Sequence, residues 1–134
     1  LYAYLRDRCQ YLVETLYSCG GHTIGTRGSC SSPYLMLSVS MEGLPLVLGA
    51  YSRANRLVSL SETLQGNPYW GIERHFRSEE ESSPVWTFRT VCAFIYQDTQ
   101  EMVRILHQAF VDVREYTKTV TLNDPLKELA VEVN

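Results

Sequence analysis

The stretch VWTFRTVCAFIYQDTQEMVRILHQAFVDV, residues 85–113, carries the strongest structural signal in this sequence. Its first half alternates bulky and smaller side chains with a period of two, which is typical of a strand with one buried face. Its second half repeats apolar residues every three to four positions, which indicates an amphipathic helix. We therefore expect a strand over Val85–Tyr96 that leads directly into a long helix.

The same two periods predict which faces are buried. Asp98 and Glu101 have the spacing of a capping box, in which each side chain bonds the backbone amide of the other, so we expect the helix to begin at Asp98. The strand face that we expect in the core carries Trp86, Phe88, Thr90, Cys92, Phe94 and Tyr96. The helix stripe that we expect to pack on the sheet carries Met102, Ile105, Leu106, Ala109, Phe110 and Val113.

A second flank of this helix is also partly apolar. Val103, His107 and Val111 lie beside the main stripe, with Arg104 and Arg114 nearby. One interpretation is a groove beside a strand that accepts an extended peptide by strand addition. The other is that these residues form the edge of a wide core face, and the sequence favours neither.

The preceding segments predict a helix and then an antiparallel meander. Apolar spacing over residues 1–19 is helical. Residues 35–41, 46–51 and 56–60 have the length and turn signals of three short strands, and residues 70–76 follow as a fourth. The Gly- and Ser-rich residues between the first helix and the first strand indicate a loop.

The last residues of the sequence are less decided. Residues 119–122 favour a short strand, and Pro125 favours a final helical turn or two.

Size and composition point to one ordinary globular domain over residues 1–134, which we expect to be a piece of a longer protein because no initiator Met is present. The net charge of -3 argues against general nucleic-acid binding, which needs a concentrated basic face. No apolar run is long enough to span a bilayer. We expect a cytoplasmic protein with reduced cysteines.

Catalytic and metal-binding motifs are not recognisable. The four cysteines lack the close pairs of a zinc site, and the three histidines do not share a helix face. A Cys92–His107 pair is a poor nucleophile candidate because the strand pattern places Cys92 in the core, where a thiol behaves as a small apolar group. We therefore expect no cofactor, no metal and no enzymatic activity.

Arginines offer one further binding hypothesis. Arg53 and Arg56 flank a predicted turn, and together they could contact a phosphate or a peripheral lipid headgroup through their planar donor forks. The alternative is that they are dispersed surface arginines paired with nearby acids.

The predicted strand order, "SVSMEG", "YWGIERHF" and "CAFIYQDTQEMVRILHQAF" together resemble the pleckstrin-homology superfold, and within it the phosphotyrosine-binding type. The resemblance covers residues 34–113 and is one of pattern. It implies an α+β fold in which an antiparallel, partly open barrel is capped by the C-terminal amphipathic helix, with an additional N-terminal helix.

The resemblance also implies a function: a non-catalytic adaptor or scaffold module that binds a peptide of a partner protein by strand addition beside the C-terminal helix. The alternatives are a longin-like domain that assembles a trafficking complex, and a phosphoinositide-binding domain. The partner-binding residues that the resemblance implies are Trp70, Ile72, Arg74, Phe76, Ile105, Ala109 and Phe110.

Overall fold

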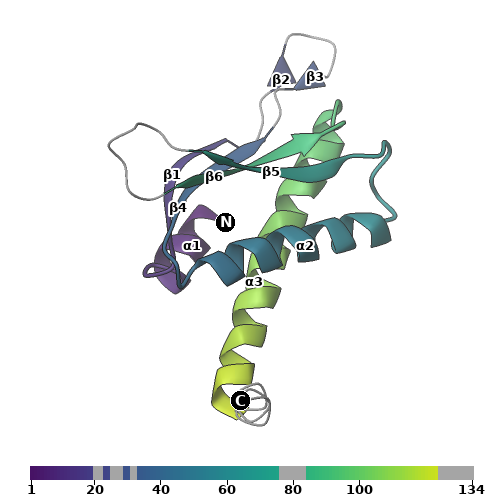
Figure 1. Cartoon of the computed structure of the whole chain (residues 1–134). Helices are drawn as coiled ribbons and strands as arrows, with labels where there is room; N and C mark the ends of the chain where they lie inside the picture. Colours follow the sequence, from purple (N-terminus) through teal and green to yellow (C-terminus); the bar gives the residue numbers. More distant parts are fainter. Residues whose placement is uncertain (20–22, 25–28, 31–32, 76–83, 124–134) are drawn as a thin grey trace.

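The computed structural model describes residues 1–19, 23–24, 29–30, 33–75 and 84–123. Groups of strands separate the three described helices along the chain (Figure 1). In chain order they are α1 Tyr2–Arg8, β1 Val13–Cys19, β2 Thr23–Ile24, β3 Ser29–Cys30, β4 Tyr34–Val39, α2 Leu44–Leu60, β5 Tyr69–His75, β6 Val85–Val91 and α3 Tyr96–Asn123.

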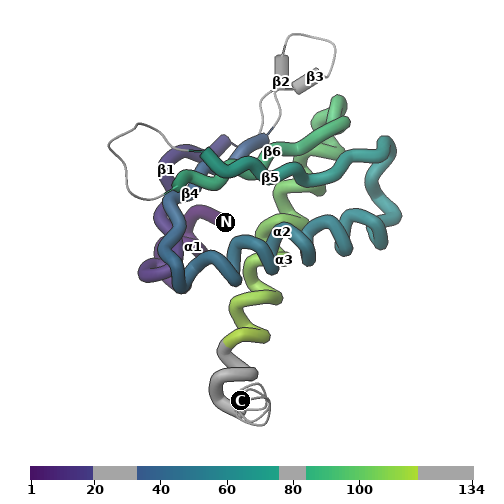
Figure 2. The backbone as a smooth tube through the Cα atoms, in the orientation of Figure 1, coloured from purple at the N-terminus to yellow at the C-terminus, as the bar shows by residue number. Residues whose placement is uncertain are grey.

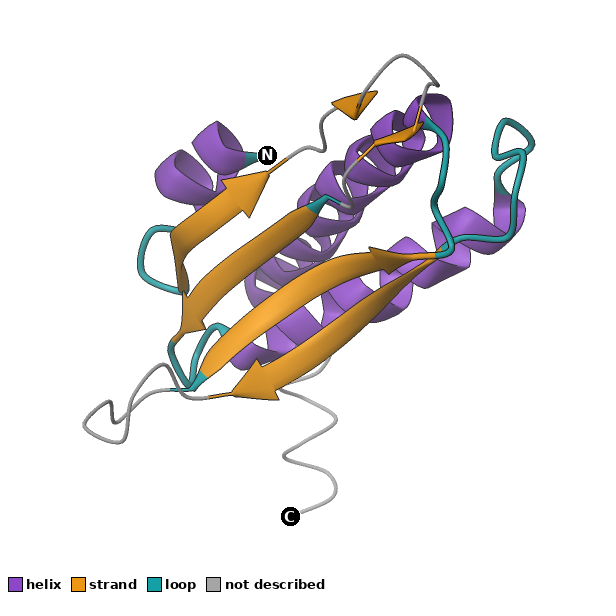
Figure 3. Cartoon of the chain, turned by 90° about the horizontal axis from the view of Figure 1, so that it is seen from above, coloured by secondary structure: helices purple, strands orange, loops and turns teal. Residues whose placement is uncertain are grey.

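Four strands form one antiparallel sheet in the order β1-β4-β6-β5, and β2 and β3 form a separate small hairpin. The described helices lie on one side of this sheet, which is seen from its other face in Figure 3. The fold is therefore α+β, as expected. The sheet is open between its two edge strands, so the predicted barrel is wrong.

The core lies between the sheet and the helices. Leu35, Leu37 and Val39 of β4 are buried on the inward face, together with Phe88 of β6. Phe88 lies in the centre, with its ring 5.7 Å from that of Phe110 on α3. Apolar side chains from every layer thus meet in one cluster, which stabilises the fold by removing them from water.

Helix α2 replaces two predicted strands. Residues 46–51 and 56–60 belong to one helix, in which Val47, Ala50 and Ala54 are fully buried at helical spacing. Pro45 lies in the first turn, where its missing amide hydrogen costs nothing. The meander prediction failed because a run of Leu, Val and Ala fits a buried helix as well as a strand.

The predicted N-terminal helix is much shorter than residues 1–19. α1 ends at Arg8, and β1 begins at Val13 and pairs with β4. Leu5 and Cys9 are buried at helical spacing, which misled the interpretation of the later apolar residues. β1 contains a β-bulge between Thr15 and Tyr17.

Strand β6 ends earlier than predicted, at Val91. Cys92 has φ of 63°, a left-handed conformation that ends the strand. The alternation is therefore lost beyond Thr90: Cys92 is exposed, Phe94 is 74% exposed and Tyr96 is 41% exposed, whereas all three were expected in the core.

Helix α3 begins at Tyr96, so the predicted capping box is wrong. The buried carboxylate of Asp98 accepts hydrogen bonds from the backbone amides of Gln65 and Gly66 at 2.9 and 3.0 Å. Asp98 therefore fastens the loop before β5 to the start of α3. The acidic side chain of Glu101 bonds Arg104 instead of the Asp98 amide.

The apolar stripe of α3 is confirmed. Met102, Ile105, Leu106, Ala109 and Phe110 are at most 1% exposed. The helix continues through residues 119–122, so the short strand predicted there is wrong. Pro125 lies outside the described residues.

Candidate functional site

The two edge strands of the sheet, β1 and β5, differ in how their outer backbone groups are used. On β5, the side-chain amide of Asn55 on α2 donates to the Trp70 carbonyl at 2.9 Å and accepts from the Trp70 amide at 2.8 Å. Asn55 thus occupies the margin of β5 as a neighbouring strand would. Hydrogen bonding alternates along a strand, so only Ile72 and Arg74 also direct backbone groups to this margin.

The hydrogen bonds of β4 show which backbone groups of β1 point outward. The Ser40 amide donates to the Leu12 carbonyl at 3.0 Å, and the Thr90 amide of β6 donates to the Pro33 carbonyl at 3.4 Å. These two bonds fix the alternation on both sides of β4 and, through its register, on β1. The β1 residues whose backbone groups point away from the sheet are Val13, Thr15 and Ser18.

One of these groups has a partner: the Val13 amide donates to the Cys9 carbonyl at 3.1 Å. Among the residues that the structure describes, no hydrogen bond is made by the backbone groups of Thr15 or Ser18 at this margin. β1 therefore presents an open edge, whereas β5 is closed at Trp70.

A crevice lies between α1 and this open edge. It has a volume of about 300 Å³ and is lined by Tyr2, Arg6 and Gln10 on one side and by residues 13–15 on the other. The tube in Figure 2 shows α1 folded back beside β1. An edge strand next to a helix is the arrangement in which strand addition takes place in many peptide-binding domains.

A second hollow, which we call the anchor pocket, lies toward the other end of β1. It has a volume of about 200 Å³ and is mostly apolar. Val103 and Leu106 of α3 and Trp70 of β5 contribute to its wall. The remaining lining residues are Leu1, Tyr2, Ser18, Cys19, Pro33, Tyr34 and Leu35. Tyr2 lines both hollows, and we refer to the crevice and the anchor pocket together as the groove.

Helix α1, one wall of the groove, is held on α3 by an aromatic contact. The Tyr4 and His107 rings are 5.7 Å apart. Burial is the main reason why the pKa of His107 is lowered. Burial is also the main reason why the pKa of Tyr4 is raised. Arg114 donates to the Arg8 carbonyl at 3.3 Å and fastens the end of α1.

Four of the predicted partner-binding residues come together, but in the core. Trp70, Ile105, Ala109 and Phe110 are at most 1% exposed. The Trp70 indole donates to the Met102 carbonyl at 3.1 Å. Their side chains therefore hold β5 and α3 together, and of the four only Trp70 lines the anchor pocket.

Other predicted site residues are dispersed. Ile72 is half-buried, Arg74 is exposed, and Phe76 lies outside the described residues. Arg53 and Arg56 lie on α2 and do not flank a turn. The Arg53 guanidinium is 3.0 Å from the Asp112 carboxylate of α3, so it joins two helices of the domain.

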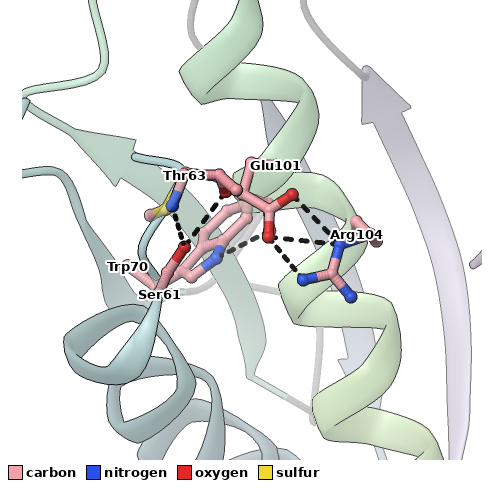
Figure 4. A network of polar contacts seen from close by, with 6 residues as sticks. Ser61, Thr63, Trp70, Glu101 and Arg104 are labelled. Atoms are coloured by element: carbon pink, nitrogen blue, oxygen red, sulfur yellow. Dashed lines mark hydrogen bonds and ion pairs between the residues drawn. The ribbon is translucent and has the colours of Figure 1, made fainter. Parts of the chain in front are cut away.

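Polar contacts surround the point where α3 passes the end of α2 (Figure 4). Arg104 bonds Glu101 on the same helix, with its Nε 3.1 Å from Glu101 Oε2. This contact, followed by a hydrogen bond from Thr63, lowers the pKa of Glu101. Ser61 and Thr63 bond each other at 3.2 Å. The network ties the α2–β5 loop to α3.

Within the described part of the chain, no cluster of His, Cys, Asp and Glu has the geometry to hold a metal ion. No described helix combines the length and apolar character needed to cross a membrane. No family model, no curated protein and no solved structure matches this sequence.

The sequence interpretation missed β1 and with it the groove. Val13, Thr15 and Tyr17 belong to residue types that are enriched in strands, and they alternate with Glu14. This signal was available, but the helical spacing of the preceding residues outweighed it. By contrast, Val103, on the helix flank singled out from the sequence, does line the anchor pocket.

Proposed function

We propose that this domain is a non-catalytic interaction module that binds an extended segment of a partner protein by strand addition to β1. The observation that carries the proposal is the unpaired outer margin of β1 at Thr15 and Ser18, next to the groove formed with α1 and α3. A guest strand would gain main-chain hydrogen bonds from the margin, and the groove would select its side chains.

The proposal keeps the mechanism expected from the sequence and moves it to another strand. The predicted guest site beside Trp70 has less support because the Asn55 amide already bonds both outer groups of that residue. Binding beside α3 is retained, since Val103 and Leu106 of that helix line the anchor pocket.

Proline substitution tests the margin directly. Pro lacks an amide hydrogen but is tolerated on an edge strand where that hydrogen points outward. Thr15→Pro should therefore leave the domain folded and remove a main-chain donor to the guest. Ile72→Pro is the matched control, because its amide also points outward but on β5.

The measurement uses peptides selected from a displayed random library on the whole chain. Their affinity for the unmodified protein, Thr15→Pro and Ile72→Pro is compared by fluorescence anisotropy, with near-ultraviolet circular dichroism as the folding check. Loss of binding in Thr15→Pro alone is the expected result. Unchanged binding of all selected peptides to a folded Thr15→Pro variant would contradict strand addition to β1.

A further inference from the structure

We infer that the end of the sheet where β5 begins and β6 ends inserts into the interface of an uncharged lipid bilayer. The insertion uses four exposed side chains, which we call the apolar tip: Tyr69, Phe94, Ile95 and Tyr96. This inference goes beyond the proposed function, because the apolar tip shares no residue with β1 or with the lining of the groove. It depends on the exposure of these side chains, on the way two loops are joined, and on the distribution of charge.

Three consecutive large side chains are exposed where the chain passes from β6 into α3. Phe94 is 74% exposed, Ile95 39% and Tyr96 41%. The left-handed backbone of Cys92 precedes them, and Ala93 is only 5% exposed, so the chain turns outward after Ala93. Single exposed apolar residues are common on protein surfaces, whereas a run of three without a role is selected against. The run therefore marks a surface that binds something.

A second loop lies beside this turn and adds Tyr69, which is 50% exposed. Tyr69 at the start of β5 pairs with Val91 at the end of β6. The Asp98 carboxylate joins the loops further, through its bonds to the backbone amides of Gln65 and Gly66. Figure 3 shows both loops at the same end of the sheet. Because these contacts already hold the loops in place, insertion of the apolar tip orders little additional chain.

The two loops carry no charge that would oppose insertion. Residues 63–69 and 90–97 contain no Asp, Glu, Lys, Arg or His, although 20% of the whole chain is charged. Asp98, the next acidic residue, is 2% exposed, and its carboxylate faces the two amides. Attraction to anionic headgroups needs Lys or Arg near the surface. The apolar tip therefore binds by apolar insertion alone, and an uncharged bilayer is the surface that fits it.

The side-chain types also match the depth profile of a bilayer interface. Phe94, the most exposed of the four, and Ile95 are wholly apolar, which suits the boundary of the acyl chains. Tyr69 and Tyr96 flank them at the starts of β5 and α3. Each combines an apolar ring with a hydroxyl, and such rings prefer the level of the headgroups. The apolar centre thus enters most deeply, and the two tyrosines stay at the polar boundary.

Vesicle flotation with the whole chain tests this inference. Vesicles of phosphatidylcholine should bind the protein, and replacing about a third of the lipid by phosphatidylserine should change binding by less than about twofold. Phe94→Ser should lower the partition coefficient about tenfold, because an aromatic side chain no longer enters the apolar phase. Ile95→Ser should act in the same direction. Met41→Ser is the matched control, since Met41 is 89% exposed but follows β4 at the other end of the sheet.

A conservative variant gives a second readout. Phe94→Trp should keep the binding, and its fluorescence emission should shift to shorter wavelength when phosphatidylcholine vesicles are added. The unmodified protein, with Trp70 and Trp86, gives the background. Near-ultraviolet circular dichroism checks that each variant is folded.

Several results would overturn the inference. These are no binding to phosphatidylcholine, binding only when phosphatidylserine is present, and equal binding of folded Phe94→Ser and Met41→Ser. Self-association that Phe94→Ser abolishes, in a protein that does not bind vesicles, would identify a second copy as the occupant. Thr15→Pro should bind vesicles as the unmodified protein does, so the failure of strand addition and the failure of membrane insertion are distinguishable.

Discussion

The side-chain amide of Asn55 gives a direct test of which sheet margin is open. Asn55→Ala removes the hydrogen bonds to both outer backbone groups of Trp70. Trp70 is 1% exposed, so water does not readily replace either bond. The substitution should therefore destabilise the domain and free the margin of β5.

The expected magnitude follows from the two bonds. At a net contribution of about 0.5–1.5 kcal/mol each, their loss costs roughly 1–3 kcal/mol. Ala has a higher helix propensity than Asn by up to about 0.7 kcal/mol, which offsets part of this loss on α2. The free energy of unfolding should fall by roughly 0.5–2.5 kcal/mol.

Urea unfolding measures this change, and hydrogen exchange of the Trp70 amide locates it. With a slope of about 1–3 kcal/mol per molar urea, the midpoint should fall by roughly 0.2–2.5 M, or about 0.75 M at the centre of both ranges. Ser59→Ala is the control, since the Ser59 hydroxyl on the same helix bonds only the Arg56 carbonyl within α2. If Asn55→Ala unfolds at the same midpoint as Ser59→Ala and Trp70 exchange is unchanged, the closure of β5 by Asn55 is refuted.

Three further predictions concern the backbone and pH. Gly43→Ala should destabilise the fold by about 3 kcal/mol, because the added Cβ would lie 2.0 Å from the Leu12 carbonyl oxygen. Gly71→Ala is the control and should change stability little, because its added Cβ has its nearest contact at 3.5 Å. Thermal unfolding compares the two variants. Cys92→Gly should raise the free energy of unfolding in urea by about 0.5–1 kcal/mol, since Gly adopts φ of 63° without strain, and a destabilised variant would contradict this. Because the pKa of His107 is lowered in the folded state, the unfolded chain binds a proton at this imidazole more readily. The free energy of unfolding should therefore fall as the pH drops from about 7.5 through 6.5. His107→Gln should remove this contribution to the pH dependence of stability.

The sequence predicts well those elements of the fold whose periodic pattern extends over many residues. The α3 stripe and the strands at residues 70–75 and 85–91 were recognised because their periods extend over many residues. Short apolar runs were ambiguous. The run that became α2 has the composition of either a buried strand or a buried helix, and only its packing against β5 and α3 decides between them.

Local capping rules also failed for a physical reason. Asp98 has the right spacing to cap a helix with Glu101, but its carboxylate bonds two amides that lie 32 and 33 residues earlier in the chain. Sequence spacing cannot reveal such a partner. The same limit applies to Cys92, whose left-handed φ ends a strand that alternation alone would continue to Tyr96.

We locate the candidate site on β1 from main-chain groups more than from side chains, whereas the sequence interpretation used the side-chain pattern and pointed to β5. Side-chain pattern made β5 attractive, with Trp70 and Ile72 on one face. Whether a margin accepts a guest depends on which backbone groups already have partners. Asn55, fifteen residues before Trp70, satisfies both outer backbone groups of Trp70 on β5, while Thr15 and Ser18 leave the margin of β1 open beside an apolar pocket. An unpaired edge normally invites self-association, and the β-bulge and the exposed Glu14 on β1 both oppose pairing with an identical strand. β1 therefore combines an open margin with features that disfavour its own copy, a combination suited to a guest of different sequence.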